Sequence, residues 1–298
     1  MPTRSHSCAF RMSRWLFALL PMLLAACATK PPQYPQASIM SVVASKGTVD
    51  LSTEVPADDY LLPDSQVFVG GRESGAVSTI AGGFGVLGVA VGMSINRTKN
   101  ANALEGTHDA MRLSFAAEQA DTFFRMAEAR APGRFVPLKP NTKAHFVLVP
   151  SARLNFGEQG DAHVSFRTKV SFLDRDTALE SGKNFYYTSF ERRNIKGVNS
   201  WSEDNAKAMK ALAAKAMPLI TEAILDDMDG RLQRASSPLN PRFVMLRPKS
   251  LAMPAQRMLV LKENAEQILV APAPRDQVFS TVVMIFERDA VEMTGVSQ

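Results

Sequence analysis

The stretch that decides the fold is Asp161-Ala-His-Val-Ser-Phe-Arg-Thr-Lys-Val-Ser-Phe-Leu-Asp174. Apolar and polar side chains alternate along it, which is typical of a β-strand with one buried face. The apolar side is expected to face the core and carries Val164, Phe166, Val170 and Phe172. The polar side is expected to face water and carries His163, Ser165, Arg167, Lys169 and Ser171. The pattern therefore predicts an antiparallel sheet that packs on the core through one face.

Two further strands are expected beside this one. Residues 144–156 are rich in apolar side chains, and a turn from Gly157 to Gly160 separates them from the first stretch. Residues 184–192 follow it and hold three consecutive aromatic side chains. Because short connections join antiparallel neighbours, we expect an antiparallel sheet of at least three strands.

Two helices are expected to flank these strands. Residues 109–131 repeat apolar side chains at helical spacing and end at Pro132-Gly133. The second helix opens at a capping-box pattern, Ser200 to Glu203, and runs to about residue 234 with a bend at Pro218. Residues 107–234 are thus predicted to form an α+β domain of one sheet and two packing helices.

The C-terminal residues, 235–298, are predicted to be a β-rich extension of that domain. Prolines interrupt the segment repeatedly, and four strand candidates lie between them, at 243–246, 258–261, 267–271 and 278–287. These strands could form a small subdomain or could be added to the central sheet.

The N-terminus carries the features of a secretory signal. An apolar run begins at Trp15, basic residues precede it, and the first 26 residues hold no acid. The run ends in Leu23-Leu24-Ala25-Ala26-Cys27. It is only 12 residues long, about 18 Å as a helix, against the roughly 30 Å of hydrocarbon that a membrane span must cross. Met12 is an alternative start that leaves this ending unchanged.

The sequence around Cys27 resembles the lipobox of a bacterial lipoprotein. The resemblance implies cleavage between Ala26 and Cys27, a diacylglyceryl thioether on the Cys27 sulfur and acylation, for instance with palmitate, of the new N-terminus. Ala28 follows the cysteine rather than Asp. In a host with two membranes, the resemblance implies a protein anchored in the outer membrane and facing the periplasm.

Removal of the leader changes what the composition implies. Three of the 34 basic residues leave with it, so the formal net charge falls from +5 to +2. No block of Lys and Arg with interleaved aromatics remains, and nucleic-acid binding is not expected. Cys8 leaves with the leader and Cys27 is the lipid site, so a disulfide, a cysteine nucleophile and a cysteine metal site are all excluded.

The chain between the lipid site and the α+β domain divides into two parts. Residues 27–48 are a proline-rich tether that follows the signal peptide, residues 1–26. Residues 49–106 are irregular and include an uncharged, glycine-rich segment, 74–96. Gly88 and Gly92 form a G-x-x-x-G pair there, a spacing that lets helices approach closely in lipid. Residues 76–95 could insert in a membrane, pack against a partner or a second copy, or lie buried under the domain.

The remaining motifs do not support catalysis, a cofactor or a metal. Gly83, Gly85 and Gly88 match G-x-G-x-x-G, but the βαβ context of a dinucleotide site is absent. The three histidines of the mature chain lack metal-ligand spacing, and residues 226–230 fail the calcium-loop pattern, which favours a solvated acidic helix turn. Trp201 is expected to fasten the second helix to the sheet rather than to anchor a ligand.

The sequence is therefore consistent with three functions. The leading hypothesis is a non-enzymatic lipoprotein that binds an envelope protein. The first alternative is a membrane-assembly or pore component that inserts residues 76–95. The second is a periplasmic hydrolase, which would need a cleft of convergent polar groups.

Overall fold

The predicted central strand pairs with its neighbours as a long antiparallel hairpin. The computed structural model describes residues 48–51, 60–61, 65–69, 102, 104–137, 146–157, 159–173, 180–232, 242–250, 255–272 and 282–295. Strand β5 (Phe146–Phe156) pairs with β6 (Ala162–Leu173) without a break in register, and β6 pairs with β7 (Glu180–Thr188). Gly157 N–H donates to the Asp161 carbonyl at 2.7 Å in the first turn, where Gly160 has φ +86°. The described residues all belong to one compact unit, Pro35–Gln298.

The sheet is mixed, which corrects the prediction of an antiparallel sheet. Its strand order is β12-β8-β9-β10-β11-β7-β6-β5-β1-β4, and β3 also pairs with β5. The pairs β11–β7, β1–β5, β3–β5 and β1–β4 are parallel. Parallel neighbours need long crossover connections, so they lie far apart in the sequence. The alternation of apolar and polar residues, together with short turns, predicts hairpins between consecutive strands. It does not predict pairings between strands that are distant in the sequence.

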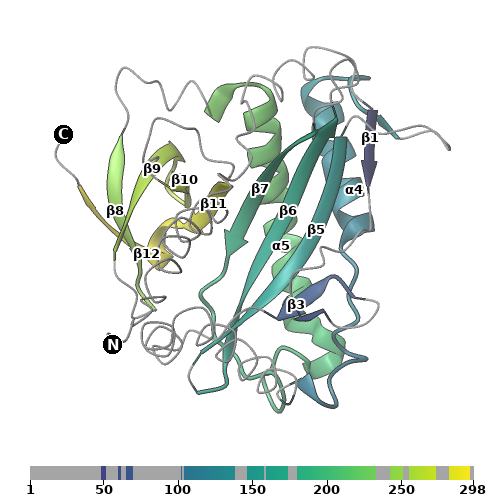
Figure 1. The fold of residues 1–298 in the computed structure, drawn as a ribbon, viewed down its shortest axis with the longest axis vertical. Helices are drawn as coiled ribbons and strands as arrows, with labels where there is room; N and C mark the ends of the chain where they lie inside the picture. Colours follow the sequence, from purple (N-terminus) through teal and green to yellow (C-terminus); the bar gives the residue numbers. More distant parts are fainter. Residues whose placement is uncertain are drawn as a thin grey trace, which may run out of the picture. The chain divides into compact units, whose positions relative to one another are not determined.

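The short N-terminal strands all lie at the β5 side of the sheet (Figure 1). Strand β1 (Thr48–Leu51) pairs with the first part of β5, and β3 (Val67–Val69) pairs further along the same strand. Strand β2 (Tyr60–Leu61) pairs with β3, and β4 (Val136–Pro137) pairs with β1.

The C-terminal strands belong to this same sheet and do not form a separate extension, so of the two arrangements left open by the sequence they adopt the second, addition to the central sheet. Strand β11 (Val282–Glu287) joins the edge of β7, so the sheet continues through β10 (Gln267–Pro272), β9 (Gln256–Glu263) and β8 (Phe243–Pro248). After the 3-10 turn η1 (Arg288–Ala290), β12 (Val291–Gly295) returns to pair with β8.

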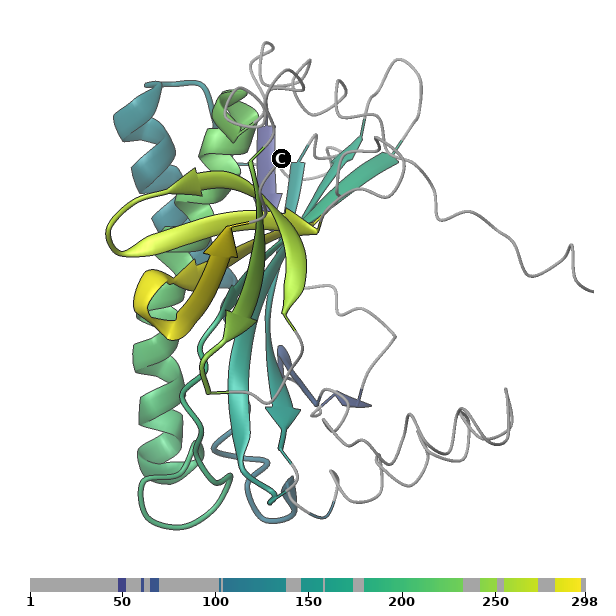
Figure 2. The same ribbon diagram turned by 90° about the vertical axis from the view of Figure 1, so that its left-hand side faces the viewer.

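Both helices lie on one face of β5–β7. Figure 2 shows α4 (Ala116–Arg130) and α5 (Glu203–Met228) on the same side of the strands. Phe166 is fully buried between sheet and helices, and its ring meets that of Phe115 edge-on at 5.5 Å. The predicted inward position of Phe166 is confirmed. The side chain of Phe172 lies outside the described part of the structure.

A polar layer crosses this core at Thr168, which the alternation pattern left unexplained. The Thr168 hydroxyl donates to Gln119 Oε1 at 2.9 Å, and Gln119 Nε2 donates to Thr221 Oγ1 at 2.7 Å. All three side chains are fully buried. One hydrogen-bonded chain therefore links β6, α4 and α5, as buried polar groups require.

The C-terminal strands have apolar side chains on both faces. One set joins the main core with α5 and includes Leu261, Leu269 and Ile285. The alternate set builds a second cluster from Val260, Val270 and other residues. Because both faces are buried, these strands have near-continuous apolar sequences rather than a simple alternation.

The second helix departs from its prediction at its first turn. Asp204, Asn205 and Ala206 have φ of 49°, 57° and 58°, in the left-handed region, whereas Pro218 is not among the residues with non-helical dihedral angles. The helix also ends earlier than expected, at Met228. The irregular part of α5 thus lies beside the loop that holds Trp201.

Candidate functional site

The candidate site is the face of β5–β7 opposite α4 and α5, called here the outer face. It comprises alternate positions of three adjacent strands: 147–155 of β5, 163–171 of β6 and 182–188 of β7. The intervening positions are buried toward the helices. Strict alternation over three strands makes the outer face a distinct surface with its own composition.

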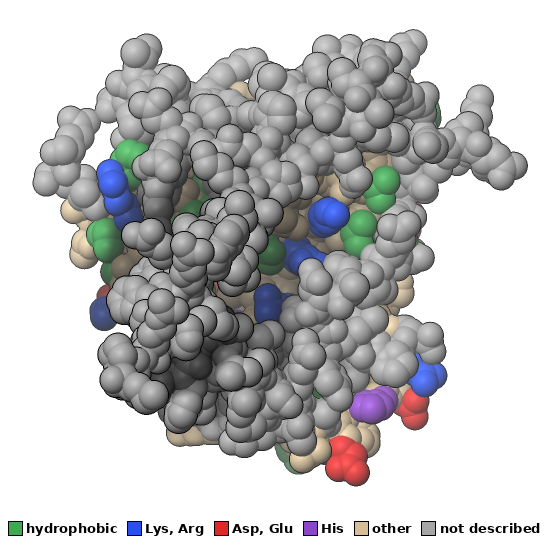
Figure 3. Space-filling view, viewed as in Figure 1, with side chains coloured by type: hydrophobic (Ala, Val, Ile, Leu, Met, Phe, Trp, Pro, Cys, Tyr) green, Lys and Arg blue, Asp and Glu red, His purple; other side chains and the backbone are tan. Residues whose placement is uncertain are grey.

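Three cations lie at neighbouring positions of the outer face. Arg167 is in register with Ser151 on one side and Tyr186 on the other, and Lys169 is in register with Val149 and Asn184. Arg153 is opposite Ser165. Figure 3, which views this face, shows Lys and Arg side chains and no acidic ones in the middle of its described surface. No Asp or Glu stands at the outer-face positions whose side chains the structure describes.

Arg167 is the central residue of this group. Its Cζ lies 5.2 Å from the centroid of the Phe68 ring, within the range of a cation–π contact. The side chain is half-buried, and its Nε has no hydrogen-bond acceptor among the described residues. Neither Arg167 nor Lys169 has a carboxylate partner in the described part of the chain. A half-buried guanidinium held on an aromatic ring presents a planar set of donors that suits an anionic or carbonyl acceptor.

The expectation that this side of β6 is fully wet is only partly correct. Arg167 and Lys169 are half-buried, while His163 and Ser165 are buried. The hydroxyl of Ser165 accepts a hydrogen bond from Asn155 at 3.1 Å and shares one with Thr188 at 3.1 Å. These contacts join β5, β6 and β7 beside the cations and hold that surface in place.

Of the histidines predicted not to bind metal, the structure describes two, His108 and His163, which lie in separate elements. His108 is exposed, and His145 falls outside the described residues. Burial, with the nearby charge of Arg192, lowers the pKa of His163 to about 4, although Asp161 acts in the opposite direction. His163 is therefore neutral near pH 7. The part of the chain that the structure describes holds no group of three or more His, Cys, Asp or Glu placed for a metal ion.

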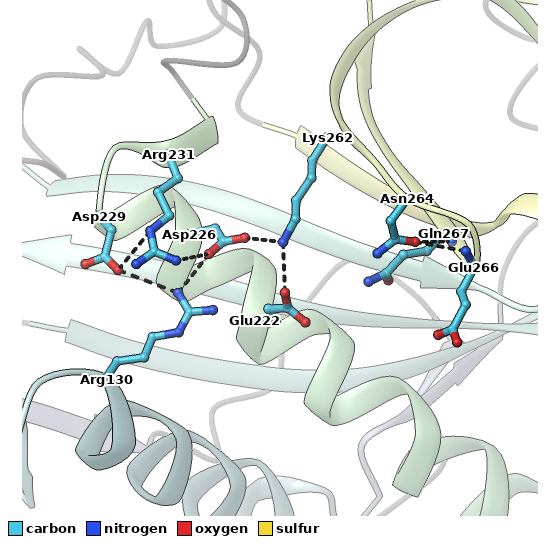
Figure 4. A network of polar contacts seen from close by, with 9 residues as sticks. All are labelled: Arg130, Glu222, Asp226, Asp229, Arg231, Lys262, Asn264, Glu266 and Gln267. Carbon is cyan, nitrogen blue, oxygen red and sulfur yellow. Dashed lines mark hydrogen bonds and ion pairs between the residues drawn. The ribbon is translucent and has the colours of Figure 1, made fainter.

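The acidic end of α5 is buried and ion-paired, which corrects the prediction of a solvated turn. Figure 4 shows Asp226 between Arg130 and Lys262, and both cations donate to its carboxylate at 2.8 Å. The next residue, Asp227, accepts from Lys183 at 2.6 Å. The exposed fractions of the Asp226 and Asp227 side chains are both 2%. The cations come from α4, β7 and β9, so the carboxylates connect the helices to both parts of the sheet.

The ion pairs of Asp226 affect the pKa of its carboxyl group more strongly than burial does. Burial alone raises the pKa of this carboxyl group. The hydrogen bonds from Lys262 and Arg130 act more strongly together and hold its pKa below the usual range. Asp226 is therefore charged and neutralised by its partners, and it has no role as a calcium ligand in this arrangement.

Trp201 fastens the loop before α5 to the sheet, as predicted. Its side chain is fully buried, and its indole N–H donates to the Ala162 carbonyl of β6 at 2.7 Å. The Arg193 guanidinium covers the ring at 5.4 Å. A buried tryptophan with a satisfied N–H has a structural role here.

The other predicted site residues lie outside the described residues. These are the lipid-attachment and cleavage positions, Cys27 and Ala26, and the packing glycines, Gly88 and Gly92. None of the helices in the described ranges is long and apolar enough to cross a membrane.

Sequence reasoning missed the clustering of cations on the outer face. The signal was present in Arg167 and Lys169, two positions apart on one strand, but Arg153 and Phe68 join them only through strand pairing. No family model matches this chain, and a search of curated proteins finds no relative.

Proposed function

We propose that this chain is a non-enzymatic bacterial lipoprotein, anchored through acylated Cys27, that binds an acidic envelope protein through its outer face. The anchor is supported by the lipobox-like sequence at residues 23–27. Two or more acyl chains give stable membrane attachment, whereas a single chain is marginal. We place the domain in the periplasm, on the outer membrane of a host with two membranes.

The observation that carries the binding proposal is the pair Arg167 and Lys169, which lack an acidic partner among the described residues. Other cations beside the core do have one, for example Arg130 and Lys183. Cations left without counter-charges on a rigid surface favour an anionic partner. Tyr and Arg are also the side chains most enriched in protein interfaces, and Tyr186 lies next to Arg167.

The number of charges favours a protein over a lipid surface. Segments that bind anionic lipid carry clusters of about 4–8 Lys and Arg, each contributing about 1 kcal/mol. Three cations supply about 3 kcal/mol on that scale, which corresponds to weak binding. An acidic protein surface can instead accept directional hydrogen bonds from the Arg167 guanidinium, and such bonds are stronger than contacts with a diffuse charge.

Site-directed photocrosslinking in whole envelopes tests this proposal. A photoreactive phenylalanine analogue replaces Tyr186 on the outer face, and in a second strain it replaces Lys210 on the exposed side of α5. We expect a defined protein adduct from position 186 and not from position 210. The adduct should fall at least about tenfold when Arg167 and Lys169 are both changed to Gln, because hydrogen bonds to charged groups are lost.

The matched control removes the same amount of charge elsewhere. Lys207→Gln with Lys210→Gln changes two exposed cations of α5 that have no ion pair among the described residues. This control should leave the adduct from position 186 intact. Equal yields in the two double variants, or adducts with lipid alone, would contradict the proposal.

A further inference from the structure

A pocket opens on the side of the molecule where the C-terminal strands join β7. Its volume is about 300 Å³, and it is open to solvent. Its walls come from four separated segments: the residues after β7, the middle of α5, the turn after β8, and the end of β11 with η1. None of the residues that line it belongs to the outer face, so it is a second and separate feature.

The floor of the pocket is a hydrogen-bonded group around Glu287. Its Oε1 accepts from the hydroxyl of Tyr187 at 2.5 Å and forms an ion pair with Lys215 of α5. Burial raises the pKa of Glu287, but hydrogen bonds from Lys215 and Tyr187 outweigh it and hold the pKa below the usual range. Glu287 is thus charged and already bound to Lys215 and Tyr187, and the Tyr187 side chain is fully buried.

The wall opposite the helix is also held in place. The Lys249 N–H donates to the Ala290 carbonyl at 3.0 Å and ties the turn after β8 to η1. Phe190 stacks on Phe286, with ring centroids 5.7 Å apart and planes at 19°. Pre-formed walls reduce the ordering that a ligand would otherwise have to impose.

Two opposite charges remain available in this pocket. Lys249 and Asp289 both line it, both are exposed, and neither has an ion-pair partner among the described residues. The third acid, Glu191, is held by the guanidinium of Arg193 at 2.5 Å. Besides burial and Glu287, the charge of Asp289 raises the pKa of the Tyr187 phenol, so this carboxylate is near the floor of the pocket.

The rest of the lining is mixed: Phe190, Leu212 and Ala290 are apolar, whereas Ser189 and Ser250 are polar. Leu212 comes from α5, Phe190 from the segment after β7, and Ala290 from η1. Small-molecule sites commonly have volumes from about 300 Å³ upward and a few placed polar groups that fix the orientation of the ligand. The volume here is at the lower end of that range and suits a ligand of one or two amino-acid residues.

We propose that this pocket binds a zwitterionic amino acid or dipeptide, with its ammonium group at Asp289 and its carboxylate at Lys249. The ion pair of Lys215 with Glu287 closes the floor, and Leu212 and Phe190 contact a small apolar side chain of the ligand. No covalent step is involved.

Calorimetric titration with three matched probes tests the assignment. The probes are alanyl-alanine, its N-acetyl derivative and its C-terminal amide, each titrated into the full mature chain in detergent. Alanyl-alanine should bind at least about tenfold more tightly than either derivative, because each derivative loses one charged hydrogen-bonding group.

Two variants then test which residue binds the ammonium group of the ligand and which binds its carboxylate. Asp289→Asn should lower the affinity for alanyl-alanine about tenfold and leave the N-acetyl derivative unchanged. Lys249→Gln should do the same for alanyl-alanine and leave the amide unchanged. Glu292→Gln, on β12 and outside the pocket lining, is the control and should bind like the parent.

The proposal fails if alanyl-alanine shows no binding at millimolar concentration, or if all three probes bind equally. It also fails if the control variant weakens binding as much as Asp289→Asn does. Circular dichroism of each variant, unchanged from the parent, separates a lost contact from a lost fold.

Discussion

The buried ion pair between Lys183 and Asp227 allows a quantitative test of how α5 is held on the sheet. The two atoms, Nζ and Oδ1, are 2.6 Å apart, and the side chains are 8% and 2% exposed. Removing one member of such a pair takes this counter-charge away from the other buried charge, which costs about 3–5 kcal/mol. That is a large part of the roughly 5–15 kcal/mol that stabilises a typical folded domain.

The perturbation is a double-mutant cycle. Lys183→Met keeps most of the aliphatic length of the side chain, and Asp227→Leu replaces the carboxylate by an apolar group of similar size. Each single change should lower the free energy of unfolding by about 3–5 kcal/mol. The combined change should come within about 1 kcal/mol of the parent, since replacing both charges removes the desolvation cost. The coupling free energy should therefore exceed about 3 kcal/mol.

Urea unfolding followed by circular dichroism supplies the free energies. The exposed pair of Arg247 and Glu292, whose side chains are 52% and 48% exposed, is the matched control. The same cycle there should give less than about 1 kcal/mol of coupling. The reasoning is refuted if the single changes at Lys183 and Asp227 cost less than about 1 kcal/mol, or if the double variant loses the sum of both.

Four other predictions follow from the same chain. Because the pKa of His163 falls to about 4 on folding from an unfolded value near 6.5, folding stability should decrease by up to about 3 kcal/mol as the pH falls from about 6.5 to 4. His163→Gln should flatten this dependence in urea titrations at several pH values. Phe166→Ala should lower the free energy of unfolding by about 3–5 kcal/mol, and a loss below 1 kcal/mol would place the ring outside the core. Cys27→Ser should abolish lipid labelling and leave unprocessed precursor on a gel; labelling of that variant would rule out the lipobox. Leu at both Gly88 and Gly92 should disrupt assembly or detergent partitioning without unfolding the domain, and unchanged behaviour would favour simple burial of the segment.

Local patterns were sufficient for the elements near the centre of the sheet. The alternation around Phe166 identified β6 and its inward face, and short turns identified β5 and β7 as antiparallel neighbours. Helical spacing identified both helices, although α4 begins later, at Ala116, than the pattern suggested. These features depend on residues within a few positions of each other, where the side-chain period of a strand or helix is visible.

Other features required the tertiary structure because they join residues far apart in the chain. The parallel contact of β11 with β7 brings Val283 beside Phe185, and no short-range pattern signals such a pairing. The acidic run at 226–229 looked solvated because its cations, Arg130, Lys183 and Lys262, come from other elements.

The features of the candidate sites likewise divide into those visible in the sequence and those that only the tertiary structure creates. The sequence by itself predicts a lipid anchor at Cys27, since a leader is defined by contiguous residues, and it determined which side of β6 carries Arg167 and Lys169. Only the tertiary structure placed Phe68 beneath Arg167 and brought Lys249 and Asp289 into one pocket. The physical reason is that a surface or pocket depends on through-space distances, which strand order and helix packing set.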